Sequence, residues 1–251
     1  TTLFRSLDDL DIVALGTVAD VVPLVGENRI IVQAGLKKMN ELPNLGIDKL
    51  IDVAGLHDKT ITAGHIGFTL APRLNAAGRV THATRAVELL ITTDPAEAMD
   101  IAEELQETNA ERQQIERAIF EEAYQSVLAQ GSLADQCIVV AGEGWHPGVI
   151  GIVASRLVEA FYKPTMVISI HDGIGKGSCR SIDRCNMYDM LTYAGDTLIQ
   201  FGGHAQAAGF SVQAEQIDAL REKASEFCRK QLTEEDYIPI VTIDGAMHSD
   251  D

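Results

Sequence analysis

One carboxylate stands inside an otherwise apolar run of this sequence. Asp20 lies within ALGTVADVVPL, which occupies residues 14–24. A buried carboxylate is costly unless it is paired or binds a metal ion, so Asp20 is a candidate metal ligand. The structural alternative is a helix cap or an ion pair in the core, and the run alone leaves both interpretations open.

A second segment combines basic side chains with small residues. LAPRLNAAGR, at residues 70–79, places Arg73 and Arg79 on either side of Asn75. Small residues allow a backbone or a phosphate to come close, and arginines can bind phosphate oxygens with two hydrogen bonds. The segment is therefore a candidate phosphate contact. A tight contact between two helices, with the arginines at the surface, would give the same pattern.

A third segment, GKGSCRS at residues 175–181, places glycines, hydroxyls and the guanidinium of Arg180 at the end of an expected strand. This combination is typical of a small anion pocket. The overlapping GIGKGS is not a Walker motif, because Lys176 is followed by Gly177 rather than by serine or threonine. An anion contact is expected here, and a nucleoside-triphosphate loop is not.

A fourth segment, FGGHAQAAGF at residues 201–210, carries Gly202 and Gly203 directly before His204. The two glycines predict an exposed, tight turn, and the small residues after them permit close approach of another molecule. We therefore expect His204 to contact a phosphate or another ligand rather than the core.

Several common catalytic and metal-binding patterns are missing from the sequence. It has no G-x-S-x-G elbow and no G-x-G-x-x-G fingerprint, and its seven histidines form no H-x-x-x-H pair. The four cysteines form no C-x-x-C pair, so a zinc site is not expected. Buried, reduced thiols of a cytosolic protein are the expectation.

The first part of the chain reads mainly as short helices. Residues 11–24 fit either a buried strand or a helix end under a turn, and residues 65–70 lead into a break at Pro72. The segments with a helical pattern are residues 27–42, 46–53 and 84–91.

The clearest element begins at Asp94, which can cap a helix whose first position is Pro95 and whose capping box is completed by Glu97. Apolar residues then recur every three or four positions, and no glycine or proline follows until Gly131. The pattern predicts a helix of about 35 residues with a narrow apolar stripe, which suits a connector between two lobes.

After Gly131 strands and helices alternate, which predicts an α/β domain. A final helix is expected at residues 213–231, and one more strand at residues 238–243. The other expected strands are residues 137–141, 165–170, 176–181 and 208–212, and the other expected helices are residues 148–161 and 186–194.

Composition bounds the class of protein. The 251 residues suit one large or two small domains, no apolar run is long enough to cross a membrane, and the first ten residues do not resemble a signal peptide. The net charge of -17 argues at first against a nucleic-acid partner. However, residues 94–124 carry -8 and residues 215–251 carry -6, so the rest of the chain is close to neutral.

The order of these segments resembles the RecJ family of bacterial 5′→3′ single-strand-specific DNA exonucleases, within the DHH phosphoesterase superfamily. ALGTVADVVPL, APRLNAAGR, a long helix, WHPGVIGIVASRL at residues 145–157, GSCRS and GGHAQAAG follow one another along essentially the whole chain. The GGH turn is shared more widely, whereas the first two segments are more specific to RecJ.

The resemblance implies a metal-dependent phosphodiester hydrolase with two Mn²⁺ or Mg²⁺ ions. By motif, it makes Asp20 a metal ligand, makes Asp20 and His204 catalytic residues, and places His204 near the active-site cleft and the bound backbone. It makes Arg180 and Ser181 the contacts of the 5′-terminal phosphate. The remaining nucleic-acid contacts that it implies are Arg73, Asn75, Arg79, Gly202 and Gly203.

The chain also departs from the family. The family's Asp-x-Asp and Asp-His-His segments should precede Asp20 but are absent from the 19 residues there, and Cys179 stands where the family usually has glycine. We therefore expect a fragment that binds no metal and is inactive on its own. Its expected parts are the end of a DHH domain at residues 1–93, a connector helix at 94–130, a mixed-sheet DHH-associated α/β domain at 131–232, and a linker at 233–251 into an OB-fold domain.

The expected partner is single-stranded DNA with a 5′ end, in cytoplasmic DNA repair and recombination. A single-strand-binding protein and a helicase are further expected partners. Two alternatives remain: a DHH-type phosphodiesterase acting on short oligonucleotides or cyclic dinucleotides, and a non-catalytic nucleic-acid-binding module.

Overall fold

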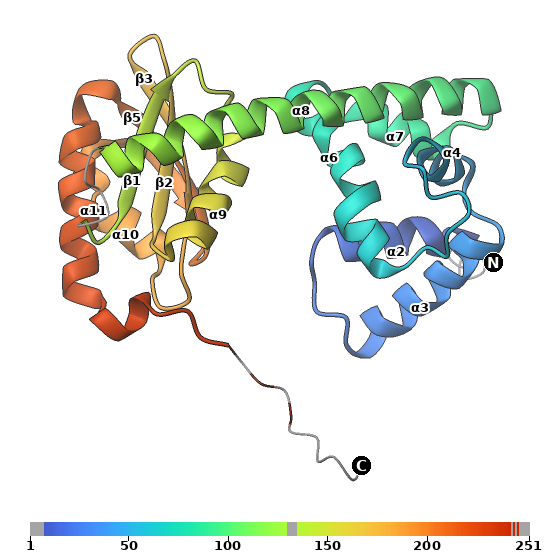
Figure 1. Cartoon of the computed structure of the whole chain (residues 1–251), viewed down its shortest axis with the longest axis horizontal. Coiled ribbons are helices and arrows are strands. Elements are labelled where there is room, and N and C mark those ends of the chain that lie inside the picture. The colour runs from blue at the N-terminus through green and yellow to red at the C-terminus, as the bar shows by residue number, and fades with distance from the viewer. Residues whose placement is uncertain (1–7, 130–134, 242, 244, 246–251) are drawn as a thin grey trace. The chain divides into compact units, whose positions relative to one another are not determined.

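The computed structural model describes residues 8–129, 135–241, 243 and 245. The chain divides into two compact units, Thr1–Gln114 and Ile115–Asp251. The first unit is helical and the second is built around a five-stranded sheet (Figure 1). Each unit has its own hydrophobic core.

The described part of the first unit consists of short helices and the first part of a long one. In order these are α2 (Leu10–Ala19), α3 (Gly26–Glu41), α4 (Leu45–Val53), α5 (Ala63–His65), the π-helix η1 (Ile66–Leu70), α6 (Ala71–Val80), α7 (Thr84–Ile91) and the beginning of α8 (Pro95–Ala129). The helices expected at residues 27–42, 46–53 and 84–91 are confirmed.

Glycines bring the helices of this unit close together. A Cβ on Gly35 of α3 would lie 2.2 Å from the carbonyl oxygen of Leu10, and one on Gly46 of α4 would lie 1.9 Å from that of Leu89. The helices meet backbone to backbone at these two points. The core of the unit consists of aliphatic side chains, including Ile47, Leu50 and Leu70. Small residues therefore decide how this unit packs.

The break expected at Pro72 is wrong. Pro72 lies in the first turn of α6, which continues directly from η1 without an intervening loop. Proline is tolerated there because the first turn of a helix has no partner for its N–H groups. The residues from 11 onward form helix α2 rather than a strand, and the helix ends at Ala19.

The long helix expected after Asp94 is confirmed as α8, with 35 residues. The Asp94 carboxylate caps it, accepting from the backbone N–H of Ala96 at 2.8 Å and that of Glu97 at 3.4 Å. The capping box does not close: the Glu97 carboxylate accepts from the Thr92 hydroxyl, whose oxygen in turn accepts from Asp94 N–H. The apolar stripe is buried, with Ile101 in the core of the first unit.

The second unit holds a mixed sheet with strand order β1-β2-β3-β5-β4. β1 and β2 are parallel and the remaining neighbours are antiparallel. Its elements are β1 (Ile138–Glu143), α9 (Ile150–Phe161), β2 (Thr165–His171), β3 (Ile174–Arg180), α10 (Met187–Tyr193), η2 (Gly195–Thr197), β4 (Leu198–Gly203), β5 (Ala207–Gln213), η3 (Ala214–Gln216), α11 (Ile217–Gln231) and η4 (Glu234–Tyr237).

Helices cover the two faces of this sheet unequally. α10 and α11 pack on one face, whose core includes Met190, Phe210 and Leu220. α9 and the end of α8 cover part of the other face, around Val140 and Val153, and α9 packs against β2 and β3. The second face is therefore open to solvent over the first part of β3 and over β5 and β4.

Two expectations for this unit need correction. The sequence does not predict β4, since its two glycines, Gly202 and Gly203, indicate a turn; they are in fact the last two residues of the strand. The strand expected at residues 238–243 does not form over residues 238–241 and 243, and residue 242 lies outside the described part of the chain. The apolar side chains there are exposed, with Val241 at 85%.

Candidate functional site

Asp20 follows α2 and lies in an open hollow of about 500 Å³ on the first unit. The chain reverses immediately afterwards, and Val21 adopts a left-handed backbone conformation with φ 58° that is unusual for a β-branched residue. The hollow is lined by Gly16, Ala19, Asp20, Asn75, Gly78 and Arg79. The structure thus brings three of the predicted site residues together: Asp20, Asn75 and Arg79.

Arg73 lies apart from this hollow although it belongs to the same helix. Asn75 and Arg79 are four residues apart on α6 and share a face, whereas Arg73 does not line the hollow. Its Nε donates to Gln106 Oε1 at 2.6 Å, and its Nη1 donates to the carbonyl oxygen of Thr69 at 2.5 Å. Burial lowers the pKa of Arg73, and these two bonds hold its guanidinium within the fold.

The carboxylate that the fold buries is Asp11, in the second position of α2, and not Asp20. Asp11 is fully buried, while Asp20 is exposed. The Asp11 carboxylate accepts from Lys38 Nζ at 2.8 Å and from the backbone N–H of Asn44 at 2.6 Å. Those partners lie 27 and 33 residues away, so no local pattern could have revealed them.

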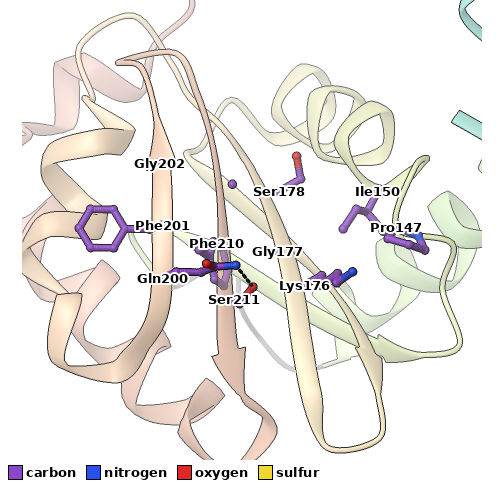
Figure 2. A pocket seen from close by; sticks show the side chains of 11 residues that line it. Pro147, Ile150, Lys176, Gly177, Ser178, Gln200, Phe201, Gly202, Phe210 and Ser211 are labelled. Carbon is purple, nitrogen blue, oxygen red and sulfur yellow. Dashed lines mark hydrogen bonds between the residues drawn. The ribbon is translucent and has the colours of Figure 1, made fainter. Parts of the chain in front are cut away.

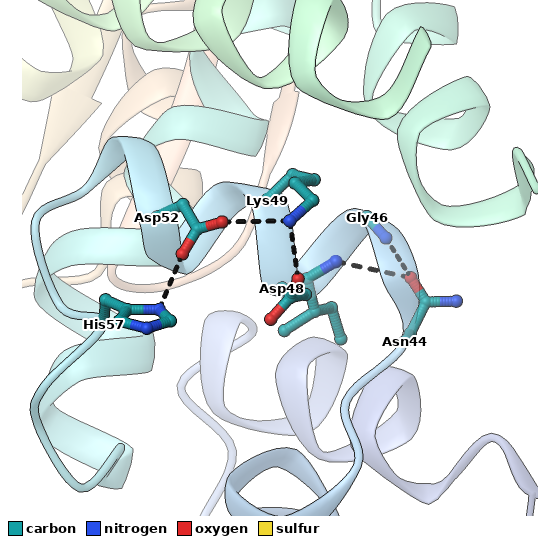
Figure 3. A network of polar contacts seen from close by, with 7 residues as sticks. Asn44, Gly46, Asp48, Lys49, Asp52 and His57 are labelled. Carbon is teal, nitrogen blue, oxygen red and sulfur yellow. Dashed lines mark hydrogen bonds and ion pairs between the residues drawn. The ribbon is translucent and has the colours of Figure 1, made fainter. Parts of the chain in front are cut away.

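A second polar network lies on α4 and the loop after it (Figure 3). Lys49 Nζ donates to Asp48 at 2.9 Å and to Asp52 at 3.0 Å, and His57 Nδ1 lies 2.9 Å from the other Asp52 oxygen. Desolvation raises the pKa of Asp52, but the hydrogen bonds from Lys49 and His57 outweigh it and leave the pKa below its ordinary value. The network ties the loop to the helix, and the sequence analysis did not single it out.

On the second unit, a polar sheet face of small and polar side chains lies on the part of the sheet that α9 leaves open (Figure 2). The strand register aligns it in rows: Gly202 of β4 and Ser178 of β3 both pair with Gly209 of β5, and Gln200 and Lys176 both pair with Ser211. We define the polar sheet face as Lys176, Ser178, Gln200, Gly202, Gly209 and Ser211.

The glycines of this sheet have two different roles. A Cβ on Gly177 would lie 2.1 Å from the Phe210 ring, so this glycine is required by the core. A Cβ on Gly202 would meet nothing within 4 Å, and one on Gly209 would meet only the Gly177 carbonyl oxygen at 3.6 Å. The fold does not need glycine at these two positions, which leaves the polar sheet face flat and its backbone accessible.

Arg180 lies at the end of β3, beside Ser178 and the beginning of α9. Its Nη1 donates to the Cys179 carbonyl oxygen at 2.7 Å and to Ser178 Oγ at 3.3 Å. A Cβ on Gly151, in the first turn of α9, would come within 3.1 Å of Arg180 Nη2. Burial lowers the pKa of Arg180, and within the described part of the chain no carboxylate forms an ion pair with it.

Ser181 does not share this position with Arg180. Its hydroxyl donates to the Cys185 carbonyl oxygen at 2.5 Å and closes a turn after β3. The hydroxyl beside the guanidinium belongs to Ser178, which the sequence analysis did not select although it lies in the same GKGSCRS segment.

His204 lies in the exposed turn between β4 and β5, as predicted. Its backbone N–H donates to the Ala207 carbonyl oxygen at 2.8 Å, which closes the turn. Gly203 before it has φ 147°, and a Cβ there would lie 2.5 Å from the Ala208 Cα, so only glycine fits. His204 is thus exposed to solvent, two residues after Gly202 of the polar sheet face.

The four cysteines are free and buried, as expected. Burial raises the pKa of the Cys179 thiol well above its ordinary value. Within residues 8–129 and 135–241, no group of three or more histidine, cysteine, aspartate or glutamate side chains is arranged to hold a metal ion. No helix of the described residues is long and apolar enough to cross a membrane.

Comparison with known proteins finds similarity first for the second unit and then for most of the chain. Residues 134–230 match the DHHA1 domain family. The single-stranded-DNA-specific exonuclease RecJ of Bacillus subtilis is 44% identical over 237 residues, which cover 94% of this chain. The chain is homologous to RecJ.

Solved RecJ structures agree with this assignment. RecJ from Thermus thermophilus in complex with Mg²⁺ is 36% identical over 89% of this chain, with a TM-score of 0.80. The same protein in complex with Mn²⁺ matches with a TM-score of 0.81. The chain spans only about a third of these relatives: 30% of the Bacillus subtilis RecJ and 35% and 33% of the two Thermus thermophilus chains.

Proposed function

We propose that this chain is part of a metal-dependent exonuclease that degrades single-stranded DNA from its 5′ end in repair and recombination. Homology to RecJ proteins supports the reaction and the substrate. Within this enzyme, the chain's main contribution is to hold the DNA backbone and its 5′ phosphate on the second unit.

One observation carries the assignment: the guanidinium of Arg180 is half-buried and has no carboxylate partner in the described residues. A desolvated cation without a counter-ion is costly, and a phosphate would supply the missing charge. Ser178 Oγ and the first turn of α9 adjoin the guanidinium, so a hydroxyl group and the N-terminal end of a helix lie beside it. We therefore assign Arg180 and Ser178 to the terminal phosphate, and keep Ser181 as a residue that positions the turn.

The polar sheet face next to Arg180 fits the rest of the strand. Its exposed glycines allow a sugar–phosphate backbone to come close, and Lys176, Gln200 and Ser211 can donate hydrogen bonds to phosphate oxygens. No aromatic ring is presented there for base stacking, since Phe201 and Phe210 point into the core. Contact with the backbone and not with base edges accounts for an enzyme without sequence preference. His204, exposed beside Gly202, is assigned to the same backbone.

The residues of this chain must also be compared with what a two-metal site requires. Two bound ions need several carboxylate and imidazole ligands. The hollow of the first unit offers one carboxylate, Asp20, together with Asn75 and Arg79. These residues alone do not fit a two-metal site, so Asp20 can supply at most one ligand of it. We assign no chemical step to this chain and propose that it does not hydrolyse DNA by itself. Asn75 and Arg79 are assigned to DNA passing the hollow, and Arg73 to positioning α6.

Replacing Arg180 with alanine tests the phosphate assignment. A hydrogen bond to a charged group contributes on the order of 1.5–3 kcal/mol, so Arg180→Ala should weaken binding of a 5′-phosphorylated oligonucleotide at least about 10-fold. Binding of the 5′-hydroxyl oligonucleotide should change little. Fluorescence anisotropy with both labelled oligonucleotides measures the two dissociation constants.

Arg229→Ala is the matched control, because Arg229 is exposed on α11, which covers the opposite face of the sheet. It should leave both dissociation constants unchanged. An equal loss on both oligonucleotides in Arg180→Ala would show that Arg180 does not read the terminal phosphate.

A further inference from the structure

Among the described residues of the first unit, Phe68 is the one phenylalanine, tyrosine or tryptophan. Its side chain lies almost entirely in solvent. Its exposed fraction is 89%, while the core of this unit consists of aliphatic side chains. The other phenylalanine of this unit, Phe4, lies outside the described residues. The fold of the described residues therefore makes no use of the Phe68 ring.

The local backbone directs this ring outward. Phe68 is the central residue of the π-helix η1, a rare form of helix that occurs often at functional sites. Ile66 and Leu70, two residues to either side, are fully buried, so the wide turn places Phe68 on the opposite side. Gly67 beside it lies against α2, where a Cβ would come 3.8 Å from Val18 Cγ1.

Phe68 belongs to the same continuous helical segment, formed by η1 and α6, as several of the residues that line the Asp20 hollow. Asn75 is seven residues after Phe68 along η1 and α6, about two helical turns or on the order of 10 Å. Asn75 and Arg79 line the hollow together with Asp20. An apolar ring and groups that bind phosphate thus follow one another along the segment.

We propose that Phe68 is a stacking platform for a base of the single strand, whose backbone passes the Asp20 hollow. Its helical neighbours one turn away are Gly64, His65, Ala71 and Pro72. A protein-docking surface would surround the ring with large aliphatic side chains, whereas a lone ring flanked by small and polar residues fits the face of a single base. The platform rests on the proposed function, and extends it by adding a base contact to the backbone contacts.

Replacing Phe68 with tryptophan gives a direct signal of stacking. The chain has one tryptophan, Trp145, which is 4% exposed and donates its indole N–H to Glu122, so it provides a constant background. The Phe68→Trp chain is titrated with oligothymidylate and with an abasic oligonucleotide of equal length. Tryptophan fluorescence should be quenched saturably by oligothymidylate and little by the abasic strand. Equal quenching by both strands would overturn stacking.

Affinity provides the second measurement. Stacking on one base typically contributes about 10-fold or more to affinity, so Phe68→Ala should weaken oligothymidylate binding by that factor. Phe68→Leu is the matched control: it keeps an apolar side chain but has no ring face, so it should lose affinity like alanine, and Phe68→Trp should retain it. Unchanged affinity in Phe68→Ala, or full affinity in Phe68→Leu, would overturn the platform.

Arg180→Ala separates this inference from the proposed function. If that variant loses its preference for the 5′ phosphate while every Phe68 variant binds like the wild type, only the stacking platform is wrong. If the unaltered chain binds neither oligonucleotide, both the platform and the proposed function are contradicted.

Discussion

At the scale of single residues, burial and partners decide what each charged group does. The sequence pattern drew attention to Asp20 as a carboxylate in an apolar run, but the buried carboxylate is Asp11, paired with Lys38. The reason is that α2 ends at Ala19, in the middle of the run, so Asp20 is exposed to solvent. Arg180 could be selected from its motif, whereas the choice of Ser178 over Ser181 needed the geometry of β3.

Substitution of the two aspartates should separate a structural from a functional carboxylate. Asp11→Ala leaves Lys38 and the Asn44 N–H without their acceptor and should lower the free energy of unfolding by about 3 kcal/mol. Asp20→Ala, at an exposed position, should change it by less than about 0.5 kcal/mol. Urea unfolding of both variants measures the difference. Equal destabilisation would contradict the assigned burial of the two side chains.

At the scale of elements, periodic and capped segments were predictable and irregular ones were not. α8 was predicted almost to its ends because Asp94 caps a long pattern free of glycine and proline. The join of η1 to α6 was missed because Pro72, usually a break, lies in a first turn where proline is tolerated. β4 was missed because its glycines suggest a turn, and only pairing with β5 makes them a strand.

The glycines of β3 and β5 give a prediction at this scale. A methyl group on Gly177 would collide with the Phe210 ring, so Gly177→Ala should destabilise the unit by about 1–3 kcal/mol. Gly209→Ala has room for its methyl group and should keep the stability, but should weaken binding of single-stranded DNA several-fold. Urea unfolding and anisotropy titration distinguish the two effects. Undiminished binding in a stable Gly209→Ala chain would argue against close contact of a backbone with the polar sheet face.

At the scale of the whole molecule, the charge distribution reconciles an acidic protein with the nucleic-acid partner that we propose. Of the net charge of -17, residues 94–124 and 215–251 carry -14, and they form most of α8 and the segment that includes α11. The polar sheet face contains Lys176 and no carboxylate, and Arg180 lies beside it at the end of β3. The chain is similar to RecJ over about a third of those proteins, so the proposed metal site would take its remaining ligands from outside the described residues.

The most direct test of this account compares binding and hydrolysis by the chain itself. The purified chain is mixed with a single-stranded oligonucleotide bearing a 5′ phosphate or a 5′ hydroxyl, with and without Mn²⁺, and both complex formation and product are followed. We expect tighter binding of the 5′-phosphorylated strand and no hydrolysis with or without the ion. Mn²⁺-dependent hydrolysis, or equal affinity for the two ends, would contradict the claim that this chain is the end-holding part of a larger exonuclease.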